Sequence, residues 1–148
     1  MRWSTAVALL IVAAPASAIR AQGYPFSQRG AVAQNVAFTE ITVRYGRPVA
    51  RGRTLFADSG LAPYGQIWHP GADSATRISF NHDVLVEGHA LKAGEYSLWL
   101  IPRGNAPWTV IVSSAAHVFH TPYPGPQRDA LRFDVAVERV SHMESMAI

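Results

Sequence analysis

The sequence predicts an all-β fold, an antiparallel β-sandwich of about seven or eight strands in one domain. Short segments in which apolar and polar residues alternate indicate strands with one buried face and one wet face. Two further segments are apolar on both faces, which is typical of strands in the interior of a sheet. The 10 Pro and 11 Gly residues are spread along the chain and leave no uninterrupted window with a helical period.

The chain begins with the pattern of a cleavable signal peptide, residues 1–18. Arg2 precedes an apolar run from Ala6 to Ala14, and Ala16-Ser17-Ala18 supplies the small residues of a cleavage site. The apolar run, about 13 Å long as a helix, is too short to span a bilayer. We expect cleavage after Ala18, with an alternative cut after Ala21. The protein is then exported to the periplasm or secreted, without a membrane anchor.

Residues 19–30 are expected to form a flexible lead-in, and residues 31–148 the β domain. Alternation predicts strands around residues 41–45, 77–80 and 131–137, and weaker patterns predict strands at 31–38, 84–86 and 143–148. The doubly apolar segments at 96–101 and 108–112 are expected to be the central strands. Turns are expected at Gly88, at Gly94 and between Pro102 and Pro107.

Composition excludes several classes of protein. The chain has no cysteine, so it can contain neither disulfides nor thiolate metal sites. Its formal net charge of +3, which falls by one with the loss of Arg2, is too small to indicate a nucleic-acid partner. At 49% hydrophobic and 16% charged residues it is too apolar for a disordered chain. We expect an apolar core that is stable without covalent links.

An ordered series of motifs resembles the bacterial DUF2911 family, exported domains of unknown function. The motifs are Tyr45-Gly46-Arg47-Pro48, Gly52-Arg53, Pro63-Tyr64-Gly65-Gln66-Ile67-Trp68, Gly71-Ala72, Thr76-x-Ile78-x-Phe80, Ala93-Gly94-x-Tyr96-Ser97-Leu98, Ile101-Pro102, Trp108-Thr109-Val110-Ile111 and Asp129-Ala130-Leu131-Arg132. The resemblance runs from about Ala31 to Ile148. It implies an exported, β-rich domain and supplies no activity.

The chain departs from this family in two ways. The resemblance implies an arginine after the motif tryptophan and an Asn-Glu pair soon after it, where this chain has His69 and Asp73-Ser74. A function that depends on those family residues would be altered here. Family members also tend to continue past a strand like Met143–Ile148, so two alternatives stay open: a fragment, or a domain that lacks its last hairpin and leaves an edge unpaired.

The long irregular stretch Gly46–Ser74 contains the residues that we select as a hypothetical ligand site. Arginines recognise carboxylates and phosphates, and aromatic rings beside a histidine and an acid can line a small-molecule or sugar site. The alternative is structural: the arginines bind loop carbonyls, and the aromatic residues close one end of the sandwich. The hypothetical ligand-binding set is Arg47, Arg53, Tyr64, Trp68, His69 and Asp73.

Histidines offer a weaker hypothesis of a metal site. His117 and His120 are the closest pair, but on a strand they would face opposite sides, and no standard zinc spacing is present. We therefore expect no cofactor. Trp99 and Trp108, within apolar strands, are expected in the core.

The sequence contains no G-x-S-x-G, H-E-x-x-H, P-loop or G-x-G-x-x-G motif. The function it favours is non-catalytic binding of a small molecule, glycan or protein. One alternative is a hydrolase or metal-dependent enzyme that uses His69, Asp73, His117 or His120. The other is a structural component of the envelope that associates through an open C-terminal edge.

Overall fold

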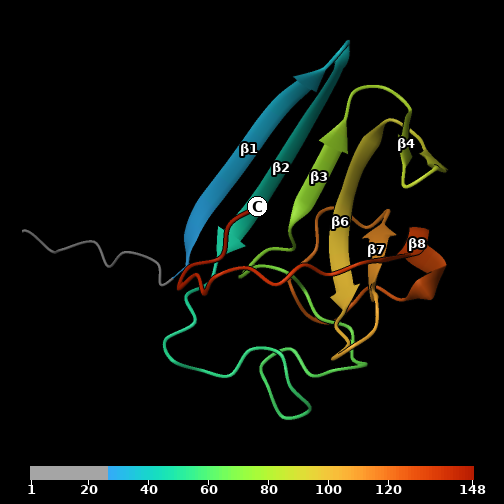
Figure 1. Cartoon of the computed structure of the whole chain (residues 1–148). Coiled ribbons are helices and arrows are strands. Elements are labelled where there is room, and N and C mark those ends of the chain that lie inside the picture. Colours follow the sequence, from blue (N-terminus) through green and yellow to red (C-terminus); the bar gives the residue numbers. More distant parts are fainter. Residues whose placement is uncertain (1–26) are drawn as a thin grey trace, which may run out of the picture.

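Eight antiparallel strands form a six-stranded and a two-stranded sheet (Figure 1). The computed structural model describes residues 27–148, so the predicted signal peptide and most of the predicted lead-in lie outside it. The elements are β1 (Gln28–Val36), β2 (Thr39–Arg47), β3 (Arg77–Phe80), β4 (Val84–Val86), β5 (His89–Leu91), β6 (Gly94–Ile101), β7 (Trp108–Ser113), the short 3-10 helix η1 (Pro126–Arg128) and β8 (Asp129–Val135). The predicted all-β, antiparallel fold is confirmed.

The large sheet has the strand order β1-β2-β3-β6-β7-β8, and every neighbouring pair is antiparallel. The two segments predicted as central strands, β6 and β7, lie inside this sheet. Two-residue turns connect β1 to β2 and β4 to β5, and the β4–β5 turn places Glu87 and Gly88 at φ 48° and 79°. Two consecutive positive φ angles are typical of the tight hairpin turn that glycine favours.

One face of the large sheet packs against the β4–β5 hairpin. Phe80, Leu91, Tyr96 and Val112 form the buried centre of this contact. Half-buried residues of the strands surround them, among them Val84 and Val86 from the small sheet and Ile78, Val110 and Phe133 from the large sheet. The two sheets therefore form two layers, as a sandwich requires, although the second layer has only two strands.

The opposite face of the same sheet carries a second core. Alternation along β6 and β7 sends Trp99 and Ile111 to this side, where their exposed fractions are 2% and 0%. Loop residues Ala75, Val118 and Tyr123 cover them in place of a third sheet. Strands that are buried on both faces explain why these two segments are continuously apolar.

The C-terminal segment differs from the prediction. Residues 143–148 are not a strand of either sheet, and only Ser145 forms an isolated bridge, to Val49. After β8 the chain crosses the face of the sheet towards β2, in front of β6 in Figure 1. We call residues 136–148 the C-terminal strap. The pattern of Met143–Ile148 suggested a strand, but the segment crosses the sheet instead of extending its edge, and Met143 and Ile148 are 54% and 50% exposed.

The long loop between β2 and β3 returns to the sheet along β6. Trp68 and Leu100 exchange two backbone hydrogen bonds of 2.7 and 2.8 Å, and Leu98 donates its N–H to the Thr76 carbonyl. Gly46 permits the close return of this loop, because a Cβ there would lie 2.3 Å from the Ala72 carbonyl oxygen. Within residues 27–148 no helix is long and apolar enough to cross a membrane.

Candidate functional site

A large cavity lies between the sheet and the C-terminal strap. Its volume is about 1150 Å³, and we call it the strap groove. Its walls are the loop over residues 48–62, the β6–β7 loop over residues 103–107, and residues 136–147 of the strap, with Trp68 and Trp108 between them. This volume is slightly above the range of about 300–1,000 Å³ that is usual for sites that hold small molecules.

Aromatic side chains form the apolar part of the strap groove. The Phe56 ring meets the Trp68 ring edge-on at a centroid distance of 5.4 Å and the Trp108 ring at 4.8 Å. The Trp108 indole N–H donates to the Arg103 carbonyl oxygen at 2.7 Å, which fixes the orientation of its ring. Phe56 remains 37% exposed, so this cluster presents an accessible aromatic surface.

The arginines of the hypothetical site bind main-chain carbonyls. Arg53 donates from Nε to Ala50 at 2.9 Å and from Nη2 to Val49 at 2.6 Å. Arg47 donates from Nε to the Met146 carbonyl at 3.0 Å. These bonds agree with the structural alternative, in which the arginines bind loop carbonyls, because they hold the loop and the strap in place. Arg53 also lines the groove, and a guanidinium has five N–H donors, so two bonds leave further donors for an anion.

Arg103 is a second guanidinium in the wall of the groove. It donates from Nη1 to the Pro107 carbonyl at 2.7 Å and lies 3.7 Å from the Asp134 carboxylate. No sequence pattern pointed to Arg103, because it belongs to a turn far from the other arginines. Arg53 and Arg103 thus place positive charge on two walls of one cavity.

The strap is fastened at the end of β2. Ala50 N–H donates to the Glu144 carbonyl at 2.8 Å, and Met146 N–H donates to the Pro48 carbonyl at 3.0 Å. The Arg51 N–H bonds the Glu144 carboxylate at 2.6 Å, and this bond, with a smaller contribution from His142, lowers the Glu144 pKa. Between β8 and this anchor the strap is exposed, with Val140 at 77%.

His69 lies on the opposite side of the sheet from the groove, although it follows Trp68 directly. Its ring is 5% exposed and meets the Trp99 ring edge-on at 5.6 Å. The Thr76 N–H donates to His69 Nε2 at 2.6 Å, so that nitrogen carries a lone pair and the proton of the neutral ring sits on Nδ1. Neither nitrogen of this tautomer offers a lone pair to a metal ion.

Burial, and to a smaller extent the neighbouring His120, lowers the pKa of His69 to about 4. The two rings are 6.1 Å apart between centroids. Nδ1 of His69 is buried and has no hydrogen-bond partner among the described residues. The ring is therefore neutral at pH 7 and adds to the core around Trp99.

Asp73, His120 and His117 lie near the surface on this second side. The Asp73 carbonyl accepts hydrogen bonds from the His120 N–H and ring, and its carboxylate lies 3.9 Å from Arg29. His117 is 2.7 Å from the Glu95 carboxylate and 2.9 Å from Arg77 Nη1. His117 and His120 thus have different partners. No group of three or more His, Asp or Glu residues within residues 27–148 could hold a metal ion.

The hypothetical set is therefore divided between the two faces. Arg53, Tyr64 and Trp68 line the groove, while Arg47 holds the strap behind it. His69 lies on the other face, because it follows Trp68 directly and neighbouring side chains on an extended segment point to opposite sides. Asp73 lies on the same side as His69, beyond the bends at residues 70–73. The strap, Phe56 and Trp108 complete the groove. Sequence patterns did not identify them, since they come together only through tertiary contacts.

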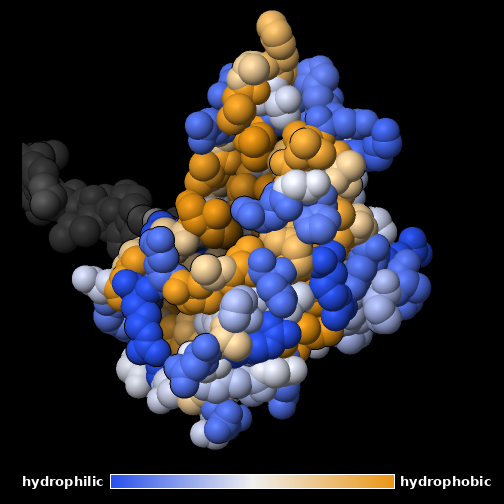
Figure 2. Space-filling view, turned by 45° about the vertical axis from the view of Figure 1, so that its right-hand side comes forward, coloured by the Kyte–Doolittle hydropathy of each residue, from blue (hydrophilic) through white to orange (hydrophobic). Residues whose placement is uncertain are grey.

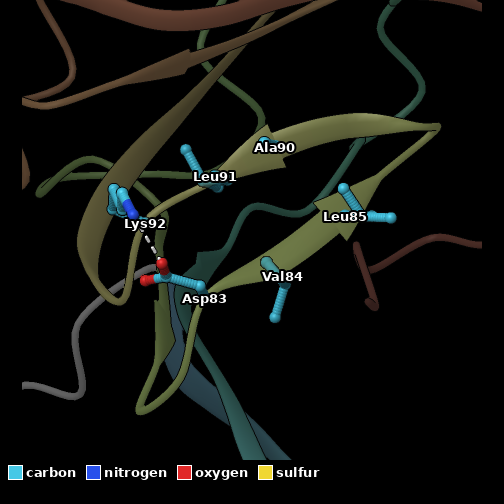
Figure 3. Close-up of a pocket in the computed structure, with 6 residues that line it drawn as sticks. All are labelled: Asp83, Val84, Leu85, Ala90, Leu91 and Lys92. Carbon is cyan, nitrogen blue, oxygen red and sulfur yellow. Dashed lines mark hydrogen bonds and ion pairs between the residues drawn. The ribbon is translucent and has the colours of Figure 1, made fainter.

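A smaller cavity of about 280 Å³ lies at the β4–β5 hairpin (Figure 3). The Asp83 carboxylate accepts a 2.7 Å bond from the Lys92 ammonium group, which lowers the Asp83 pKa. Leu85, which is 73% exposed, lines this cavity together with Val84 and Ala90. Because its only charged pair is already satisfied, this cavity is a weaker candidate than the strap groove.

Comparisons with known proteins return one family. The family model described as a protein of unknown function (DUF2911) matches residues 27–148, which are all the residues that the structure describes. No curated protein and no solved structure matches the chain.

Proposed function

The chain belongs to the DUF2911 family, whose function is unknown, and we propose that it is a non-catalytic binding domain that holds a small molecule in the strap groove. The observation that carries the proposal is the aromatic cluster of Phe56, Trp68 and Trp108 inside a cavity of about 1150 Å³. Large apolar pockets with a few polar groups are the usual form of a ligand site.

The chemistry of the walls favours a ligand with a flat apolar body and an anionic group. The rings of Phe56 and Trp68 offer faces and edges against which a ring can pack. Arg53 and Arg103 offer guanidinium donors for a carboxylate, sulfonate or phosphate. Glycans and protein segments are the other partners that the sequence suggests.

Two titratable groups, His69 and Glu144, support binding without catalysis. His69, whose pKa departs strongly from its ordinary value, faces the opposite core. The pKa of Glu144, which lines the groove, is lowered by hydrogen bonds, so its carboxylate is a weak base. We propose that this binding takes place outside the cytoplasm, as the signal-peptide pattern of residues 1–18 suggests.

The aromatic cluster should bind an aromatic sulfonate such as 1-anilinonaphthalene-8-sulfonate with saturable, one-to-one stoichiometry. Replacing Trp68 by alanine removes one of the two indole rings of the groove, and we expect the dissociation constant to rise by about tenfold or more. Dye fluorescence titrations at constant ionic strength measure the change. Phe56→Ala, at a more exposed position, should weaken binding in the same direction.

Leu85→Ala is the matched control, because Leu85 is 73% exposed and lies on the β4–β5 hairpin outside the groove. It should leave the dissociation constant unchanged. Near-ultraviolet circular dichroism must show native packing in each variant, since this dye also binds partly unfolded states. Unchanged binding by folded Trp68→Ala and Phe56→Ala proteins would exclude the groove as the binding site.

A further inference from the structure

The two edges of the large sheet differ in their protection against pairing with another chain. β1 and β8 are the outer strands, and nothing in the described part of the chain pairs with their free edges (Figure 1). Outer strands carry unpaired N–H and C=O groups that can template a further strand. A protein that remains monomeric in solution guards such edges with charges, prolines, bulges or short strands.

β8 has charged residues and a bulge that hinder pairing with another chain, whereas β1 has almost none of these features. Within seven residues β8 has Asp129, Arg132 and Asp134, and a bulge interrupts its pairing with β7. β1 has nine residues, no proline, no irregularity in its pairing with β2, and no charged residue from Gly30 to Val36. The long free edge of β1 is therefore open to backbone pairing.

One face of this edge also carries exposed apolar side chains. Val32 and Val36 lie on the same side of the strand, with exposed fractions of 41% and 52%, and Phe38 in the following turn is 91% exposed. Figure 2 shows apolar residues at the surface below the tip where β1 and β2 join. A partner strand along β1 would cover part of this surface while it satisfied the backbone groups.

We propose that β1 is a homodimer interface, in which it pairs antiparallel with β1 of a second copy to form a continuous twelve-stranded sheet. A two-fold axis at Val32 pairs all nine residues of one strand with all nine of its mate, which is the largest overlap available. Arg29, the only charged residue of β1, then lies opposite Asn35, so no like charges meet. Because the remaining edges are the charged β8 strands, the assembly closes at two copies.

Sedimentation equilibrium of the chain without residues 1–18 tests the proposal across the micromolar range. We expect a dimer for the unmodified protein and a dissociation constant at least about tenfold higher for Val32→Lys, which places a charge on the pairing edge. Leu85→Lys introduces the same charge at an exposed strand position away from β1 and should leave the dimer intact. Thermal unfolding of each variant shows whether it remains folded. A monomer throughout, or a dimer that folded Val32→Lys does not weaken, would overturn the proposal.

A cysteine scan tests the register independently, because the chain has no cysteine of its own. Val32→Cys places two thiols on the two-fold axis, about 5 Å apart between Cα atoms, where a disulfide can form. Gln34→Cys, on the same face of the strand, separates the thiols by four residues, or about 13 Å, beyond disulfide reach. Mild oxidation should give a cross-linked dimer for the first variant alone. Equal cross-linking of both would contradict this register.

Discussion

Replacing Trp99 by alanine should lower the free energy of unfolding by about 3–5 kcal/mol. Trp99 is 2% exposed, and its ring contacts His69 at 5.6 Å and Tyr123 at 5.4 Å, both edge-on. Its indole N–H donates to Ser97 Oγ at 2.9 Å, so truncation also leaves a buried hydroxyl without this partner. Because β6 is held on both sides in the sheet, collapse around the vacated space is restricted.

A loss of this size is a large part of the total stability expected of a small domain, about 5–15 kcal/mol, and the chain has no disulfide to offset it. Urea unfolding followed by circular dichroism measures the loss. Leu85→Ala, at an exposed strand position, should stay within about 0.5 kcal/mol of the unmodified protein. A loss below about 1 kcal/mol for Trp99→Ala would show that the second core contributes little.

Trp99 also separates stability from binding. It faces the core opposite the strap groove, so Trp99→Phe, which retains an aromatic ring, should bind the aromatic sulfonate as the unmodified protein does. Trp68→Ala should weaken binding of the aromatic sulfonate, and its loss in the free energy of unfolding should be smaller than that of Trp99→Ala. Substitution of Trp99 therefore tests the core on one face of the sheet, and substitution of Trp68 tests the groove on the other face.

The strands could be predicted because their pattern is local. Alternation around Ile41–Tyr45 and Leu131–Val135 reflects one buried face, and continuous apolar residues in β6 and β7 reflect two buried faces. The weakly predicted strands had different outcomes. The segment at 84–86 forms β4, but 143–148 forms no strand, and β5 (His89–Leu91) was not predicted.

The candidate site was predicted only in part, for a geometric reason. Tyr64, Trp68, His69 and Asp73 are close in sequence, which suggested one cluster. An extended segment alternates its side chains, so Trp68 lines the groove and His69 enters the opposite core. Trp108 was expected in the core, yet it is half-buried and lines the groove, because the strap covers that end of β7 incompletely.

Acidification from pH 6.5 to pH 4 should destabilise the fold through His69. Its pKa in the folded chain is about 4, lowered first by burial and then by His120, against 6.5 when it is unperturbed. Above pH 6.5 the ring is neutral in both states and contributes no pH dependence. Between pH 6.5 and pH 4 the unfolded chain binds a proton that the folded chain does not, so protonation favours unfolding. The loss reaches about 3 kcal/mol near pH 4 and then levels off.

His69→Gln tests this assignment, because a glutamine side-chain oxygen can accept the Thr76 N–H in place of Nε2 without titrating. Urea unfolding at several pH values should show a fall in stability between pH 6.5 and pH 4 that is smaller in this variant by about 3 kcal/mol. His82→Gln removes an exposed histidine and should retain the full fall. If His69→Gln retains the full fall as well, His69 is protonated in the folded chain. The Thr76 N–H could then no longer be bonded to Nε2, and the loop that carries Trp68 into the groove would have to be held in another way.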